Sequence, residues 1–88
     1  MRVEIEDWKN GWFGIDIGLT PEEITRLIGL LQMLEQEPDQ HFHISSDYKA
    51  TGGVGDIQIA VLAPAAESNM NLTSRAYAPG EIIDRSDL

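Results

Sequence analysis

The alternation of apolar and polar residues near the start of the chain predicts two strands. Val3 and Ile5 alternate with glutamates, and Phe13, Ile15 and Ile17 alternate with glycine and aspartate. A period of two is typical of a strand that buries one face. We therefore expect a β-hairpin whose apolar side chains face a core and whose polar side chains face water.

The connection Lys9-Asn10-Gly11 determines the register of this hairpin. A two-residue Asn-Gly turn would point the apolar faces of the two strands in opposite directions, which a sheet with one buried face does not tolerate. A three-residue loop with Gly11 in the left-handed conformation pairs Trp8 with Trp12 instead. The apolar residues of the two strands then lie opposite one another, so we predict the three-residue loop.

A period of about 3.6 residues predicts a helix after the second strand. Thr20 is a good N-cap, Pro21 suits the first turn, and Glu23 completes a capping box. Pro38 disfavours helix at the residue before it, so we expect the helix to end at about Gln36.

Residues 41–48 and 54–62 alternate in the same way and predict a second hairpin. The order of elements is therefore β-β-α-β-β. We expect an α+β domain of two layers, in which one helix packs on a four-stranded antiparallel or mixed sheet. The pattern leaves the strand order open, because the helix can return the chain beside either strand of the first hairpin.

The predicted core consists of the apolar residues that share one face of each element. These are Val3, Ile5, Phe13, Ile15, Ile17, Ile24, Leu27, Ile28, Leu31, Leu34, Phe42, Ile44, Ile57, Ile59 and Val61. Gly29 lies within the helix, where glycine costs about 1 kcal/mol relative to alanine. We therefore expect another part of the backbone to lie close to Gly29.

The last quarter of the chain has little periodicity. We expect one domain over residues 1–63 and a loop-like tail over residues 64–88 that packs at the periphery. Its packing residues are Met70, Leu72, Tyr77, Ile82 and Ile83.

Composition narrows the class of protein. The 88 residues are 42% hydrophobic and 24% charged, which is typical of a single globular domain. With 15 acidic and 6 basic residues the net charge is −9, which disfavours nucleic-acid binding. The absence of cysteine excludes disulfides, thiolate metal sites and cysteine nucleophiles. The sequence shows no membrane span or signal peptide, so we expect a cytoplasmic protein.

The predicted register places acidic and aromatic side chains together on the face of the first hairpin that points away from the core. They are Glu4, Glu6, Trp8, Trp12 and Asp16. In a single four-stranded sheet, Asp47 and Asp56 of the second hairpin share this face. The two tryptophans can pack on each other, with tail residues covering them, or can form a recognition patch. An acidic face with aromatic anchors complements a basic protein surface, such as the substrate groove of a nuclease.

Two histidines raise the question of a metal site. His41 and His43 share a strand face but lie about 6.5–7 Å apart by strand rise. Zinc needs three or four protein ligands, and the remaining ones would be Asp47, Asp56 or a glutamate. Solvated histidines are the commoner outcome, so we expect no metal and no cofactor. We assign no catalytic residue either, because the pattern offers no oxyanion hole beside Ser45.

Three pieces of the chain carry a resemblance: WKNGWFGIDIGLTPEEI, HFHISSDY and GGVGDIQIAVL. Over Val3 to Leu62 this small, acidic, cysteine-free α+β chain resembles the immunity proteins encoded beside bacterial polymorphic toxins. The resemblance is one of overall build, so it assigns no functional residues. It implies a protein that binds and blocks a cognate toxin without catalysis.

Two other functions stay open. One is a small metal-binding or hydrolytic protein built on the His41 and His43 pair with Asp47 and Asp56. The other is a homo-oligomer, such as a homodimer, that pairs through an exposed sheet edge or through the tryptophan face.

Overall fold

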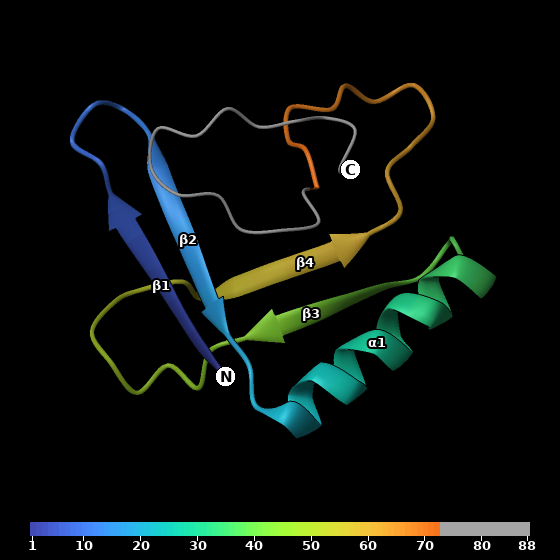
Figure 1. Ribbon diagram of the computed structural model, residues 1–88, viewed down its shortest axis with the longest axis horizontal. Coiled ribbons are helices and arrows are strands. Elements are labelled where there is room, and N and C mark those ends of the chain that lie inside the picture. Colours follow the sequence, from blue (N-terminus) through green and yellow to red (C-terminus); the bar gives the residue numbers. More distant parts are fainter. Residues whose placement is uncertain (73–88) are drawn as a thin grey trace.

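The computed structural model describes residues 1–72, and within them the fold is α+β with the predicted order β-β-α-β-β (Figure 1). The elements are β1 (Arg2–Asp7), β2 (Phe13–Gly18), α1 (Pro21–Gln36), β3 (His41–Ser45) and β4 (Asp56–Ala60). The part of the tail that contains Tyr77, Ile82 and Ile83 lies outside the described residues.

β1 and β2 form an antiparallel hairpin in the predicted register. Val3 lies opposite Ile17, and Ile5 lies opposite Ile15. The buried-face argument therefore identified the correct loop. Because side chains alternate along each strand, the apolar residues occupy one face of the hairpin and the acidic residues the other.

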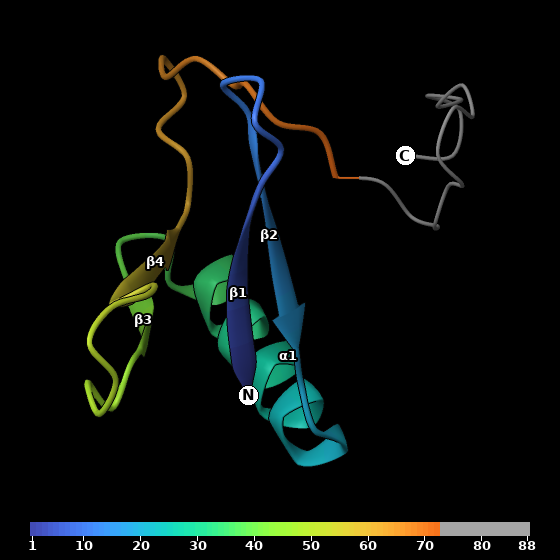
Figure 2. The same ribbon diagram turned by 90° about the vertical axis from the view of Figure 1, so that its left-hand side faces the viewer.

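The expected four-stranded sheet is not formed. β3 pairs with β4 alone, from His41 opposite Ala60 to Ser45 opposite Asp56, so the four strands make two separate two-stranded sheets. Figure 2 shows β1 and β2 standing apart from β3 and β4. Across a hollow from β1 lie Gly53 and Val54, which belong to the loop between β3 and β4. A loop therefore lies near β1 where a single sheet would need a strand.

α1 begins and ends where the sequence predicts. The Thr20 hydroxyl accepts a hydrogen bond from the Glu23 backbone N–H at 3.2 Å, and the Glu23 carboxylate accepts one from the Thr20 N–H at 3.0 Å. This capping box satisfies two of the N–H groups that a helix start leaves without partners. At the other end, the Glu37 N–H donates to the Met33 carbonyl at 2.8 Å.

The buried core is small and lies between α1 and the second hairpin. Among the described residues, Leu34 at 6% exposure and Phe42 at 8% are the buried apolar side chains. Figure 1 shows α1 running alongside β3. A cavity of about 180 Å³ between Leu27 and Leu30 of the helix and β3 shows that this contact is not closely filled.

More than half of the predicted core is exposed to solvent, which corrects that prediction. Val3, Leu27, Ile44, Ile57 and Ile59 are half-buried, whereas Ile5, Phe13, Ile15, Ile17, Ile24, Ile28, Leu31 and Val61 are exposed. The helix has two adjacent apolar stripes, and only the stripe with Leu34 is turned toward β3. Within residues 1–72, no element packs closely over the other stripe of the helix or over the apolar face of the first hairpin.

The expected backbone contact at Gly29 is wrong. A Cβ added at this position would meet no atom within 4 Å.

Residues 61–72 run on without helix or strand. The Ala66 N–H donates to the Ala63 carbonyl at 2.9 Å and forms a turn, and the side chains of Met70 and Leu72 are exposed. In the described part of the chain, no helix has the length and apolarity that crossing a bilayer requires.

Candidate functional site

The loop between β1 and β2 fixes the positions of the two tryptophans. The Trp8 N–H donates to the Trp12 carbonyl at 3.1 Å, which closes the three-residue loop. Gly11 adopts the predicted positive φ, at 92°. Lys9 also has a positive φ of 60°, which the sequence analysis did not foresee. A hydrogen bond of 2.8 Å from the Lys9 N–H to the Asp7 carboxylate accompanies this conformation, as in an Asx-turn.

Trp8 lies over β2 and not on the other tryptophan. A Cβ added at Gly14 would lie 3.1 Å from two atoms of the Trp8 indole, so the ring covers the strand at Gly14. Within the described residues, the close aromatic ring pair is His41 with His43, whose centroids are 5.0 Å apart. The structure therefore does not show Trp8 and Trp12 packed on each other.

Both tryptophans remain open to solvent. Trp8 is 55% exposed and Trp12 is 71% exposed. Trp12 is held through its backbone, because its N–H donates to the Asn10 side-chain oxygen at 3.0 Å. The two indoles thus present large apolar surfaces at one end of the hairpin, on a backbone fixed by hydrogen bonds.

The register places the predicted carboxylates on the same face as Trp8. Glu4 lies opposite Asp16, and Glu6 lies opposite Gly14, over which the Trp8 ring lies. Like charges directly opposite on two strands repel each other. The Arg2 guanidinium forms an ion pair with Glu4 and offsets part of this negative charge. All three carboxylates are exposed. We call the set of Glu4, Glu6, Trp8, Trp12 and Asp16 the acidic Trp face.

The structure separates this face from the acidic residues of the second hairpin. A single sheet would place Asp47 and Asp56 on a shared face with the tryptophans, as expected from the sequence, but the two hairpins form separate sheets. Asp56 instead joins a polar cluster on β3 and β4. Its carboxylate oxygens lie 2.9 and 3.1 Å from His43 Nδ1, and the Ser45 hydroxyl donates to it at 2.9 Å.

The cluster affects the acidity of Asp56. The hydrogen bonds from His43 and then from Ser45 stabilise the carboxylate and lower the pKa of the Asp56 carboxyl. His43 and Ser45 both bond to this one carboxylate. In a serine hydrolase the histidine takes the proton from the serine. The observed arrangement therefore provides no activated serine nucleophile.

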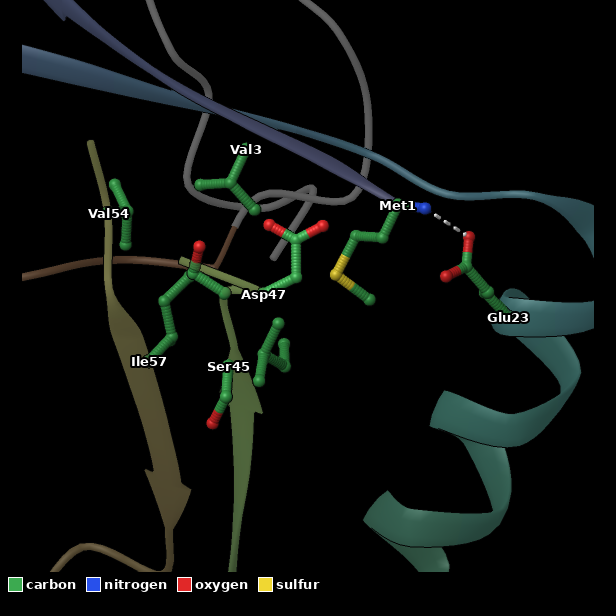
Figure 3. A pocket seen from close by; sticks show the side chains of 9 residues that line it. Met1, Val3, Glu23, Ser45, Asp47, Val54 and Ile57 are labelled. Atoms are coloured by element: carbon green, nitrogen blue, oxygen red, sulfur yellow. Dashed lines mark ion pairs between the residues drawn. The ribbon is translucent and has the colours of Figure 1, made fainter. Parts of the chain in front are cut away.

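Asp47 points to a different part of the molecule. After β3 ends at Ser45, the chain turns, and Asp47 lines a hollow of about 400 Å³ together with Met1 and Val3 (Figure 3). Figure 3 shows the Asp47 carboxylate turned toward Val3, whereas the Ser45 hydroxyl points away from the hollow. The Met1 amino group forms an ion pair of 2.8 Å with Glu23 at its rim.

These positions bear on the metal hypothesis. Asp47 lines the hollow, whereas His43 is engaged by Asp56. In the part of the chain that the structure describes, no three histidine or acidic side chains converge as metal ligands would. The four residues His41, His43, Asp47 and Asp56 are thus not brought together as one ligand set.

Sequence reasoning missed the hydrogen-bonded cluster of His43, Ser45 and Asp56. Alternation places His43 and Ser45 on one face of β3, but their contact with Asp56 depends on the register between β3 and β4. Residues 46–55 connect these strands, and a loop of this length does not fix a register as a tight turn does.

No protein-family model matches the chain, and no similar curated protein or solved structure is found.

Proposed function

We propose that this protein is a non-catalytic protein-binding module whose acidic Trp face binds a partner with a basic surface. The observation that carries the proposal is the pair of exposed indoles, Trp8 and Trp12, at the loop end of a hairpin whose exposed carboxylates share a face with Trp8. Tryptophan is among the residues most enriched at the energetic centres of protein interfaces.

The carboxylates give this face its preference for a basic partner. The chain has a net charge of −9, and Glu4, Glu6 and Asp16 add a local negative field beside the tryptophans. Complementary charge accelerates encounter and disfavours acidic partners, while buried aromatic side chains slow dissociation. The two kinds of residue thus support different steps of one binding reaction.

The specific form that we favour is an immunity protein that neutralises a cognate toxin in the cytoplasm. A toxin that acts on nucleic acid carries a basic groove, and an acidic face with aromatic anchors complements such a groove. This form is supported by the resemblance of overall build over Val3 to Leu62. It requires no metal, cofactor or catalytic residue of this chain.

The first experiment captures the partner from the cells that naturally make this protein. The native chain and the Trp12→Ala variant serve as baits, and Phe13→Ala is the matched control. Phe13 is the next residue, is also exposed, and lies on the opposite face of the hairpin. We expect a basic protein that the native and Phe13→Ala baits retain and the Trp12→Ala bait loses.

The second experiment measures the kinetics of the captured pair. Trp12→Ala should raise the dissociation rate and cost about 2 kcal/mol or more, as central aromatic anchors do. Glu6→Gln should mainly slow association and flatten its dependence on salt. A partner that the Trp12→Ala bait retains as well as the native bait would refute the proposal. Toxicity of the partner that co-expression fails to suppress would refute its immunity form.

A further inference from the structure

The first hairpin has a second exposed surface, opposite the acidic Trp face. It consists of the side chains that the sequence pattern assigns to the core, which we call the apolar hairpin face: Val3, Ile5, Phe13, Ile15 and Ile17. Phe13 and Ile15 are each 61% exposed, and Ile5 is 53% exposed. Isolated apolar residues on a surface need no explanation, but a contiguous group of this kind is typical of an interaction site.

The second hairpin lies near the β1 side of this face. Val3 lines the hollow of about 400 Å³ with Val54 and Ile57, and Ile5 lines a neighbouring hollow with Gly53 and Val54. Leu34 of α1 is buried, and Figures 1 and 2 both show the loop end of the first hairpin far from α1. Within residues 1–72, the β2 side of the apolar hairpin face, with Phe13 and Ile15, is therefore left open.

Charge is separated cleanly between the two faces of the hairpin. Along β1 and β2, the carboxylates of Glu4, Glu6 and Asp16 all lie on the acidic Trp face. Asp7 is the one charged residue in register with the apolar hairpin face, and it lies at the loop end opposite Phe13. Two such apolar faces can therefore meet while most of the negative charge remains on the outside.

We propose that a second copy of this chain covers the apolar hairpin face, with the two hairpins packed face to face about a twofold axis. An isologous contact needs only one self-complementary surface, and a face that is apolar along both strands meets this need. Two packed sheets lie about 10 Å apart, so apolar side chains from both copies fill the layer between them.

The exposed area indicates a reversible dimer. Ile5, Phe13, Ile15 and Ile17 present on the order of 100 Å² each, so two copies bury on the order of 800 Å². Stable specific interfaces bury about 1,200–2,000 Å² in total, and weaker ones fall below this range. We therefore expect association that depends on protein concentration.

A second copy fits this face better than the basic partner proposed above, because such a partner is attracted to the carboxylates of the opposite face. The dimer does not rest on the proposed function. Both acidic Trp faces point outward from it, so each copy keeps its partner site.

The test is the mass in solution over a wide range of protein concentrations, measured by sedimentation equilibrium. We expect the average mass to rise from monomer to dimer and no further. Added salt should strengthen the association, because it screens the repulsion between two chains that each carry a charge of −9. Binding at the acidic Trp face should respond to salt in the opposite direction, which separates the two proposals.

One matched pair of variants locates the contact. Ile15→Glu and Gln58→Glu each add one carboxylate at an exposed strand position, but Gln58 lies on β4, opposite His43. We expect Ile15→Glu to weaken dimerisation at least tenfold and Gln58→Glu to leave it unchanged. At low protein concentration, where the monomer predominates, both variants should melt like the native chain, which shows that the fold is retained.

Three results would overturn the dimer. The first is a monomeric mass at all concentrations, and the second is the same dimerisation constant for Ile15→Glu and Gln58→Glu. The third is an average mass above that of a dimer, which would indicate pairing through open strand edges. Loss of the dimer in Ile15→Glu with unchanged partner capture would support both proposals. Loss of capture in Trp12→Ala with an unchanged dimer would confirm that the two faces act separately.

Discussion

At the scale of single residues, the contact between Trp8 and Gly14 determines what the hairpin presents to solvent. The absence of a side chain at Gly14 lets the indole approach β2 closely, while the rest of the ring remains exposed. A held aromatic side chain loses less conformational freedom on binding than a free one, which favours affinity. Gly14 thus serves the proposed binding face without touching a partner itself.

A prediction at the residue scale concerns the acidity of Asp56. Its pKa is lower in the folded chain than in the unfolded chain, so the carboxylate stabilises the fold at pH values above its unfolded pKa. This contribution is lost as the pH falls through the folded pKa. We expect His43→Ala to raise the pKa of Asp56 toward its ordinary value, and Ser45→Ala to raise it less.

Carbon NMR of the Asp56 carboxyl group, followed through an acid titration, measures this pKa directly. Gln58→Ala is the control, because Gln58 lies opposite His43 and no hydrogen bond from it to Asp56 is present. Identical titration curves for the native chain and His43→Ala would show that the contact does not persist in solution.

At the scale of elements, the hairpin and the helix are each specified by their own local interactions. In the loop, the side chains of Asp7 and Asn10 accept hydrogen bonds from backbone N–H groups. These bonds stabilise the loop that contains the two positive-φ residues, Lys9 and Gly11. In the helix, Thr20 and Glu23 cap the first turn. An isolated two-stranded hairpin is marginally stable in water, so these local bonds matter more for β1 and β2 than for buried strands.

Two glycines in different elements provide a matched pair of alanine substitutions. Gly29→Ala places a methyl group in open space on α1 and should raise the free energy of unfolding by about 0.5–1 kcal/mol. Gly14→Ala places its methyl group 3.1 Å from the Trp8 ring and should displace that ring. Chemical denaturation measures the first effect, and tryptophan fluorescence reports the second.

The expected fluorescence change in Gly14→Ala is a shift in the emission of Trp8 toward that of a fully solvated indole. Gly29→Ala should leave the emission of the native state unchanged. An unchanged spectrum for Gly14→Ala would show that the Trp8 ring does not lie over β2 in solution. A destabilised Gly29→Ala would show that a neighbouring group fills the space beside the helix.

At the scale of the whole molecule, stability depends on a small region around Leu34 and Phe42. These side chains are buried between α1 and β3, whereas most of the apolar surface of the first hairpin is exposed. A domain of this size has a small free energy of unfolding, so the removal of one buried aromatic side chain costs a large fraction of it.

The same substitution at two phenylalanines tests whether the stability of the fold depends mainly on the region around Leu34 and Phe42. Phe42 is 8% exposed and Phe13 is 61% exposed. Phe42→Ala should lower the free energy of unfolding by about 3–5 kcal/mol, whereas Phe13→Ala should lower that of the monomer by less than about 1 kcal/mol. Thermal melting at low protein concentration, where the monomer predominates, makes the comparison.

Equal losses of stability in the two variants would contradict a core confined to the region around Leu34 and Phe42, because they would place Phe13 in a core that encloses both hairpins. At high protein concentration, Phe13→Ala should also weaken the proposed dimer, whereas its partner binding through the acidic Trp face should persist.

The sequence by itself determined the features that depend on residues close together in the chain. The buried-face argument at Lys9-Asn10-Gly11 predicted the hairpin register, and with it the shared face of Trp8 and the carboxylates. Thr20 and Pro38 predicted the ends of α1 to the residue. These features are local because turn geometry, capping bonds and alternation involve neighbours within a few residues.

Only the tertiary structure decided which apolar face is covered and by what. Alternation shows that a face is apolar, but it does not name the element that packs on it, and α1 has two stripes of which one is turned toward β3. For the same reason, the sequence pattern predicted that Asp47 and Asp56 share a face with Trp8 and Trp12. In the structure they belong to the second hairpin, which forms a different sheet. Contacts between distant segments depend on the path of the chain through space, which a local pattern does not contain.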